Sequence, residues 1–289
     1  MADATLNAGA GSQPIAGKLP VFATVGRAYG AAFRQFGTVV RIAWFWALLL
    51  LGLNWLLLSL LPAWMSDPKA IMLLDLKSIL LLSVFGLLNG LLFLPPLASI
   101  AVNWHRALLL GERPGSFAFV RLDGPVWHYV GFAAVLMIIR FAATLPQTLT
   151  TLGQGGAPGG NPFLILLGSV VVVVVFMFLP RLSLALPGAA IGDGDTSMAS
   201  GFAATRRNTW RLAWGSVLCL LPVLALGAFT TFVWPGQAVM LSASPLAIAV
   251  RCAFGLVWPF FGVVLVGFMS YVYAHFYGAR VAALRQAQK

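Results

Sequence analysis

The fold of this chain is decided first by residues 163–182, FLILLGSVVVVVVFMFLPRL, in which Arg181 is the only charged residue. The six consecutive valines of this stretch, Val170–Val175, would favour a β-strand in water. A lone strand in lipid leaves its backbone N–H and C=O groups without partners, whereas a helix satisfies them internally. About 20 apolar residues also match a hydrocarbon core of about 30 Å, because a helix rises 1.5 Å per residue. We therefore predict a transmembrane helix here.

Five further stretches have similar length and character. They are Ile42–Leu61, Ile79–Val102, Val126–Leu145, Leu212–Val233 and Cys252–Tyr273. The 289-residue chain is 60% hydrophobic and only 9% charged, whereas soluble globular proteins carry about 25% charged residues. This deficit excludes a water-soluble domain, a disordered chain and a fibrous repeat. It predicts an all-α integral membrane protein with six transmembrane helices.

Lys and Arg residues are distributed unequally between the two sides of these spans. Of the 18 in the chain, 14 fall in the N-terminal segment, the loops joining spans 2–3 and 4–5, and the C-terminal tail. Only Lys69 and Lys77 fall in the loops on the other side. Because basic residues are retained on the cytoplasmic side, both termini are predicted to be cytoplasmic. In such a chain the net charge of +11 indicates topology and contact with anionic lipid rather than binding of nucleic acid.

The domain organisation follows from the same pattern. Residues 1–17 are small and polar and have no apolar core followed by a cleavage site, which predicts a disordered N-terminus rather than a cleaved signal peptide. Residues 18–279 are predicted to form one six-helix domain, and residues 280–289 a cytoplasmic tail.

Two short patterns recur at related offsets. RIAW at 41–44 returns as RLAW at 211–214, an offset of 170, and FLPPL at 93–97 returns as FLPRL at 178–182, an offset of 85. Three parallel two-helix repeats, related by an axis along the membrane normal, would explain both offsets. The predicted arrangement is a pseudo-threefold bundle with repeats at about 20–106, 107–191 and 192–277. Coincidence combined with shared topology is the alternative.

Residues 20–41, ahead of the first span, carry two stripes with helical spacing. One comprises Phe22, Tyr29, Phe33, Phe36 and Val40, and the other comprises Arg27, Arg34 and Arg41. Aromatic and basic stripes without acidic residues are typical of an amphipathic helix in the headgroup region. We therefore predict contacts between these arginines and anionic head groups; packing against the bundle ends is the alternative, and both can hold together.

A second basic set precedes the fifth span. Asp195, Thr196 or Ser197 can cap the start of a short helix, and Arg206, Arg207 and Arg211 follow it. Closely spaced guanidinium groups can bind a phosphate bidentately. The two interpretations of this set are a headgroup site and a topology signal.

The segment 178–212, FLPRLSLALPGAAIGDGDTSMASGFAATRRNTWRL, has a further pattern. An Arg ends a span, a Pro stands among small residues, and an acidic turn, a Ser cap, Thr-Arg and Trp-Arg follow. These are Arg181, Pro187, Asp193, Ser197, Thr205-Arg206 and Trp210-Arg211. The segment resembles the membrane domain accompanying bacterial glycerophosphodiester phosphodiesterases and its stand-alone six-span relatives. The resemblance implies a bacterial inner-membrane protein. The phosphodiesterase activity is not expected, since no soluble catalytic domain fits in the chain.

Residues with catalytic or metal-binding potential are few. The sequence has no HExxH, no GxSxG and no aspartate pair within the predicted spans. Its histidines lie near the inner ends of spans, where solvated side chains are expected, and Cys219 and Cys252 are expected to be reduced. We predict no enzymatic activity, metal or cofactor. Arg140, Asn54 and Asn89 lie within spans and are candidates for a polar cavity, with snorkelling or helix packing as the alternative.

Three functional hypotheses remain. The first is a non-enzymatic polytopic inner-membrane protein that interacts with anionic lipid or takes part in membrane homeostasis. The second is a channel or facilitator with a pathway along the pseudo-threefold axis, which a hydrated axial cavity would favour. The third is an accessory subunit of a membrane complex, with a membrane protein as partner.

Overall fold

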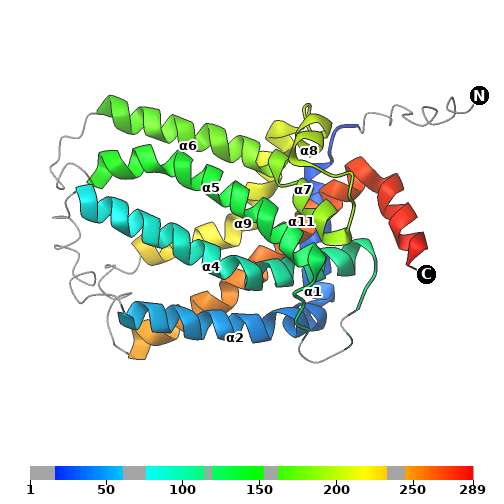
Figure 1. Cartoon of the computed structure of the whole chain (residues 1–289), viewed down its shortest axis with the longest axis horizontal. Helices are drawn as coiled ribbons and strands as arrows, with labels where there is room; N and C mark the ends of the chain where they lie inside the picture. Colours follow the sequence, from blue (N-terminus) through cyan, green and yellow to red (C-terminus); the bar gives the residue numbers. More distant parts are fainter. Residues whose placement is uncertain are drawn as a thin grey trace, which may run out of the picture.

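The computed structural model describes residues 17–60, 76–113, 115, 119–152, 162–232 and 245–288. Every regular element in these residues is a helix. The longer helices are α2 (Phe36–Leu60), α4 (Leu76–Leu109), α5 (Gly124–Leu152), α6 (Pro162–Leu182), α9 (Thr209–Phe232) and α11 (Pro245–Ala287), and the shorter ones are α1 (Val21–Arg34), α7 (Ala185–Ile191) and α8 (Met198–Ala204). Figure 1 shows the long helices side by side, with the short ones gathered at one end. The N-terminal prediction for residues 1–16 lies outside the described part.

Five segments of the described chain are long and apolar enough to cross a membrane. They are Phe36–Leu57, Ser83–Leu109, Gly124–Pro146, Ile165–Ile191 and Phe260–Ala287. The remaining predicted span corresponds to α9, whose apolar part, Thr209–Ala225, is shorter. The predicted all-helical membrane character is thus confirmed, while the sixth span and the orientation stay predictions.

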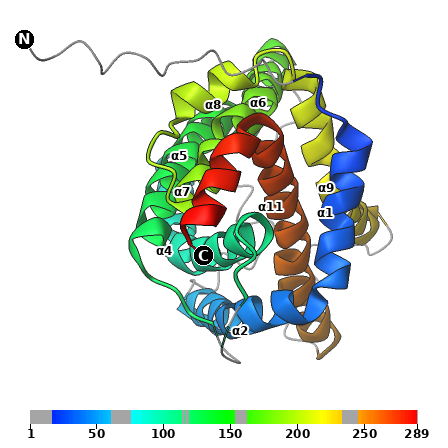
Figure 2. The same cartoon turned by 90° about the vertical axis from the view of Figure 1, so that its right-hand side faces the viewer.

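Helix α11 occupies the middle of the bundle. It contacts α1, α2, α4, α7 and α9, and Figure 2 shows it between α1 and α4. Half of its apolar segment is buried, against 11–28% in the other four. Lipid can cover the outer helices but not a central one. The side chains of α11 therefore pack against the neighbouring helices and form the core with them.

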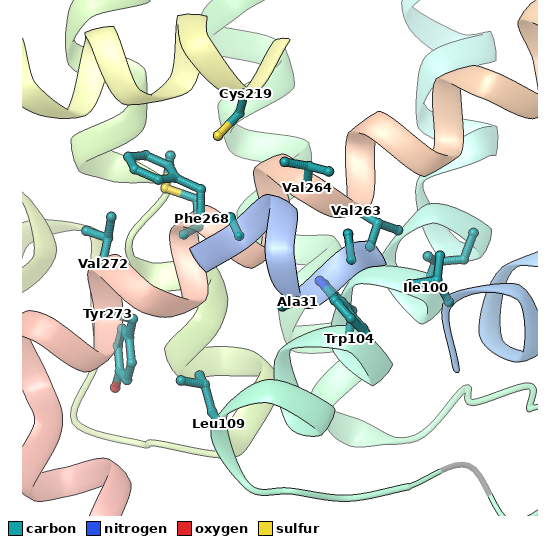
Figure 3. Close-up of a cluster of buried hydrophobic side chains, with 14 of the residues drawn as sticks. Ala31, Ile100, Trp104, Leu109, Cys219, Val263, Val264, Phe268, Val272 and Tyr273 are labelled. Atoms are coloured by element: carbon teal, nitrogen blue, oxygen red, sulfur yellow. The ribbon is translucent and has the colours of Figure 1, made fainter. Parts of the chain in front are cut away.

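The core is built around the aromatic residues of α11 and α4. Phe268 and Tyr273 of α11 and Trp104 of α4 are fully buried (Figure 3). Phe268 lies over Gly215 of α9, so closely that a Cβ atom on that glycine would stand 2.2 Å from the ring Cζ. Small residues allow such close approach of membrane helices. Gly215 therefore fixes how near α9 lies to α11.

The N-terminal helical segment differs from the prediction of one helix over residues 20–41. It breaks at Gln35, which has φ −107° and ψ 28°, between α1 and α2. The Gln35 carbonyl accepts hydrogen bonds from the N–H groups of Thr38 and Val39 at 2.8 and 3.0 Å, which helps to start α2. No proline marks this elbow in the sequence, so it was not foreseen.

The segment between α6 and α9 forms a compact corner. Helix α7 ends at Gly192, whose φ of 78° is left-handed and favours glycine. Helix α8 then begins at Ser197, whose hydroxyl accepts from the Ser200 N–H at 3.1 Å, and Ser200 Oγ accepts in return from the Ser197 N–H at 2.9 Å. This capping box confirms the predicted helix start at residues 195–197.

The helices end or are interrupted near the predicted ends of the repeats. Gly111, just after α4, has φ 79°, close to the 78° of Gly192 after α7, and α11 is interrupted at Tyr277 with φ −125°. These positions lie close to the predicted repeat ends at 106, 191 and 277. The threefold relation itself stays a prediction.

The residues assigned to a cytoplasmic tail continue α11 as far as Ala287. Val281 is buried, and Arg285 donates from Nε and Nη2 to the Leu109 carbonyl at 3.1 and 2.6 Å. A basic side chain is favourable at the C-terminus of a helix, where carbonyl groups lack partners. Residues 280–287 therefore pack against the end of α4.

Candidate functional site

One end of the bundle holds most of the charge. We call it the polar end; it comprises α1, residues 106–113 and 119–123, α7, α8, the start of α9 and the end of α11, which lie together in Figure 1. All the acidic residues in the described part of the chain belong to it: Glu112, Asp123, Asp193 and Asp195. This gathering of charge is the arrangement expected at a membrane surface.

A basic pocket of about 570 Å³ opens in the polar end. Its walls are the elbow between α1 and α2 and the chain that follows α4. They comprise Arg34, Gln35, Gly37, Thr38 and Arg41 on one side and Ala107, Gly111, Glu112 and Arg113 on the other. The left-handed Gly111 ends α4 and turns the chain toward the elbow, and the N–H of Phe119 donates to the Arg41 carbonyl at 3.4 Å.

Glu112 is the acidic residue of this pocket, and arginines outside the pocket hold it. Arg106 forms a bidentate pair with it, with Nε 2.8 Å from Oε2, and Arg121 Nη1 lies 3.4 Å from Oε2. The hydrogen bond from Arg106 lowers the pKa of Glu112 below its usual value, against the opposing effect of burial. Glu112 is therefore ionised at neutral pH, and its charge is offset locally.

The predicted headgroup arginines of the first set lie on α1 and α2. Arg34 and Arg41 line the basic pocket, whereas Arg27 lies with its guanidinium carbon 5.2 Å from the centroid of Tyr271. Most side chains of the apolar stripe are exposed, Phe22 by 81% and Phe33 by 61%, whereas Tyr29 is half-buried. On the opposite face α1 buries Ala28, Ala31 and other small residues. Both interpretations of residues 20–41, membrane contact and bundle packing, are thus compatible with the arrangement.

The second basic set divides in two. Arg206 and Arg207 are exposed after α8. Arg211 instead donates from Nη1 to the Leu19 carbonyl at 2.6 Å, and Asn208 Oδ1 accepts from the Leu19 N–H at 2.9 Å. Arg211 therefore holds the start of α1 against α9, and its headgroup role stays a prediction.

Arg181, treated in the sequence as an orientation signal, is 4% exposed. Its guanidinium carbon lies 3.5 Å from the centroid of Phe202, Nε donates to Thr205 Oγ1 at 3.2 Å, and Nη2 donates to the Phe202 carbonyl at 2.5 Å. The carbonyl is at the end of α8, where a cation complements the helix dipole. This arginine thus joins α6 to α8.

A cluster of hydrogen bonds around the buried Asp193 carboxylate joins the α7–α8 turn to α11. The Asp193 carboxylate accepts from Tyr273 Oη, from Thr196 Oγ1 at 2.8 Å and from the Asp195 N–H at 3.1 Å. Arg280 Nη1 lies 3.5 Å from the same carboxylate. Burial alone would raise the pKa of Asp193, but the hydrogen bonds from Tyr273, Thr196 and Asp195 outweigh it and place the pKa below its usual value. Hydrogen bonding to the charged form has this effect generally.

The candidates for a polar cavity are not brought into either of the two pockets described here. Arg140 on α5 and Asn54 on α2 are exposed, and Asn89 on α4 is half-buried. The second pocket, of about 280 Å³, lies between α4, α5, α7 and α11, and Tyr129 is the only residue of its lining with a polar side chain. The cavity predicted around Arg140, Asn54 and Asn89 therefore gains no support.

The expectation of solvated histidines is wrong for His105. This side chain is 1% exposed, and its Nδ1 lies 2.7 Å from Ser270 Oγ on α11. Buried polar groups normally have such a partner. His105 thus helps to hold α4 to α11.

Sequence reasoning missed Glu112 and Arg113 as parts of a site. Gly111-Glu112-Arg113 lies beyond the predicted second span, which ends at Val102, and follows α4, which ends at Leu109; a glycine with charged neighbours could have drawn attention to the turn. No protein-family model, curated protein or solved structure matches this chain. The resemblance stated for residues 178–212 is therefore untested.

Proposed function

We propose that this protein is a non-enzymatic polytopic membrane protein of the bacterial inner membrane that binds anionic lipid head groups at its polar end. The observation that supports this most directly is that exposed arginines and exposed tryptophans occur together at the polar end of the bundle. Trp127, Trp210 and Trp214 are 54–64% exposed, at the starts of α5 and α9. Tryptophans at such positions anchor at the headgroup level.

The exposed arginines at this level have no acidic partners among the described residues. The ion pairs found there use Arg106, Arg121 and Arg280, and no carboxylate in the described part of the chain pairs with Arg34, Arg41, Arg206 or Arg207. A basic residue near an anionic surface contributes about 1 kcal/mol to binding. Several such residues would enrich anionic lipid around the polar end.

The other functional hypotheses receive less support. A channel needs a polar or hydrated pathway, whereas the pocket among α4, α5, α7 and α11 has an apolar lining and α11 fills the middle of the bundle with buried aromatic side chains. An accessory role in a membrane complex stays a hypothesis.

The lipid proposal is tested by replacing Arg206 and Arg207 with Gln. Two exposed charges of about 1 kcal/mol each predict an enrichment of anionic over zwitterionic lipid that is several-fold lower, measured by mass spectrometry of lipids co-purified with the protein. Replacement of both with Lys keeps the charge and should keep the enrichment. Unchanged enrichment in the Gln variant, with normal insertion, would make these arginines topology signals only.

The proposed orientation is tested by cysteine labelling of a variant lacking Cys219 and Cys252. Most basic loops are predicted to be cytoplasmic, so a cysteine at Ala157 or Ser244 should react with an impermeant thiol reagent in intact cells. A cysteine at Ser116 should react only after permeabilisation. The reverse pattern would invert the proposed topology.

A further inference from the structure

The basic pocket can bind an anion more specifically than general attraction to the membrane surface would. It is a concave site with charged residues in its own walls. Arg34 and Arg41 lie on the two sides of the elbow at Gln35, and Arg113 faces them from the chain after α4. The volume of about 570 Å³ is in the range of small-molecule sites. Three guanidinium groups from separate segments thus surround one cavity.

The pocket carries a surplus of positive charge. Glu112 lies in its wall, but that carboxylate is already bound by Arg106 and Arg121, and Asp123 is bound by Arg121 at 3.2 Å. In the described part of the chain, Arg34, Arg41 and Arg113 form no ion pair. Three exposed cations that line one cavity without a carboxylate of their own favour the binding of an anion there.

The chemistry of the walls indicates which anion. Planar guanidinium groups bind phosphate oxygens with two parallel hydrogen bonds, and Thr38 in the same wall carries a hydroxyl group that can donate to a phosphate oxygen. A phosphate is therefore a better match than a simple halide or a large apolar molecule.

The surroundings of the pocket distinguish a lipid from a free phosphate. Phe33, Phe36 and Val40 stand next in sequence to Arg34, Gln35 and Arg41, and their side chains are 61%, 53% and 40% exposed. Exposed apolar side chains on the helices that carry a cationic site can contact acyl chains while the arginines contact the head group. Phe33 and Phe36 contact Phe260 of α11, with ring centroids 5.5 and 5.7 Å apart, but more than half of each side chain stays exposed. A soluble phosphate would leave this apolar surface uncovered, whereas an acyl chain would cover it.

Building on the proposed function, we propose that this pocket is a specific site for the phosphate group of one anionic phospholipid, contacted by Arg34, Arg41 and Arg113. The elbow between α1 and α2 would then be held by the lipid as well as by protein. Glu112, tied to Arg106 and Arg121, keeps Arg113 in place by ordering the turn after α4.

The test compares two double variants of the full chain that lose the same charge at the same end. Arg34→Gln/Arg41→Gln removes two pocket arginines, and Arg206→Gln/Arg207→Gln removes two exposed arginines outside it. Native mass spectrometry counts phosphatidylglycerol molecules retained by each protein during delipidation in neutral detergent. We expect the wild type and the Arg206/Arg207 variant to retain one tightly bound molecule, and the Arg34/Arg41 variant to bind it at least tenfold more weakly.

Further variants keep the result interpretable. Arg34→Lys/Arg41→Lys should restore part of the retention, and Arg113→Gln should lower it without touching the elbow. Thermal unfolding of each variant shows whether the fold is intact; an Arg34→Gln/Arg41→Gln protein with a wild-type midpoint that still retains one lipid as tightly as the wild type would overturn the site.

The remaining outcomes separate this inference from the proposed function. Equal, partial loss in both double variants would mean diffuse attraction, which overturns the pocket but leaves the proposed function standing. No loss in either would contradict both. Stabilisation of the wild type by inorganic phosphate, absent in Arg34→Gln/Arg41→Gln and not reproduced by phosphatidylglycerol, would make the pocket a site for soluble phosphate and overturn the lipid assignment.

Discussion

Replacing Gly215 with Ala is expected to destabilise the bundle by about 3 kcal/mol, at the upper end of the range for overpacked cores. The new methyl group would lie 2.2 Å from Cζ and 2.7 Å from Cε2 of Phe268. The Phe268 ring is fully buried, so α9 must move away from α11 or the ring must leave its rotamer. Denaturant unfolding in detergent micelles measures the loss.

Two controls make this prediction specific to the contact. In Gly215→Ala/Phe268→Leu the shorter side chain makes room for the methyl group, and a coupling energy of about 1–3 kcal/mol is expected between the two sites. Gly227→Ala lies on the same helix, where a Cβ atom meets nothing within 4 Å, and it should be neutral or stabilising because Ala favours helix by about 1 kcal/mol. Equal stability of Gly215→Ala and wild type would show that the two helices are not packed as described.

Replacing Asp193 with Asn is the second change with a large expected effect, a loss of about 2–3 kcal/mol in the free energy of unfolding. The carboxylate accepts hydrogen bonds from Tyr273, Thr196 and a backbone N–H, and it faces Arg280. Hydrogen bonds to a charged group contribute about 1.5–3 kcal/mol, and an amide can replace only some of them. The matched control is Asp195→Asn, two residues away, whose side chain is exposed.

The same carboxylate makes stability depend on pH. Its pKa in the folded protein lies below its ordinary value of 3.8, so the ionised form stabilises the fold above that value, and this contribution is lost as the pH falls through the folded pKa. Asp193→Asn should therefore flatten the fall in thermal midpoint between about pH 5 and pH 3. Some dependence should remain, since the pKa of Glu112 is also lowered. A fall as steep as in the wild type would exclude Asp193 as a source.

The long helices could be predicted from the sequence because lipid leaves the backbone few alternatives. The run Val170–Val175 lies within α6, despite its strand-favouring residues. The start of α8 was also predictable, since Ser197 caps it through local hydrogen bonds. Both features depend on residues that are neighbours in the chain, and such residues can be read directly from a single sequence.

The depth and partners of the arginines could not be predicted in this way. A count of basic residues assigns a side of the membrane but not a degree of burial, so it could not separate the buried Arg181 from the exposed Arg206. The contact of Arg211 could not be foreseen because its partner, the Leu19 carbonyl, is 192 residues away. The basic pocket was missed for a similar reason, because its walls come from segments about 70 residues apart.

The hydrogen bonds of α1 have a consequence for the order of events during synthesis. Leu19 is tied to Asn208 and Arg211, and Tyr29 Oη donates to the carbonyls of Leu218 and Cys219 at 3.1 and 3.0 Å. At about 5–20 residues per second, a ribosome needs roughly 10–40 s to reach these partners. During that interval the first helix made must wait at the membrane surface, where its exposed aromatic and basic side chains hold it, until the segment that completes its binding site has been inserted.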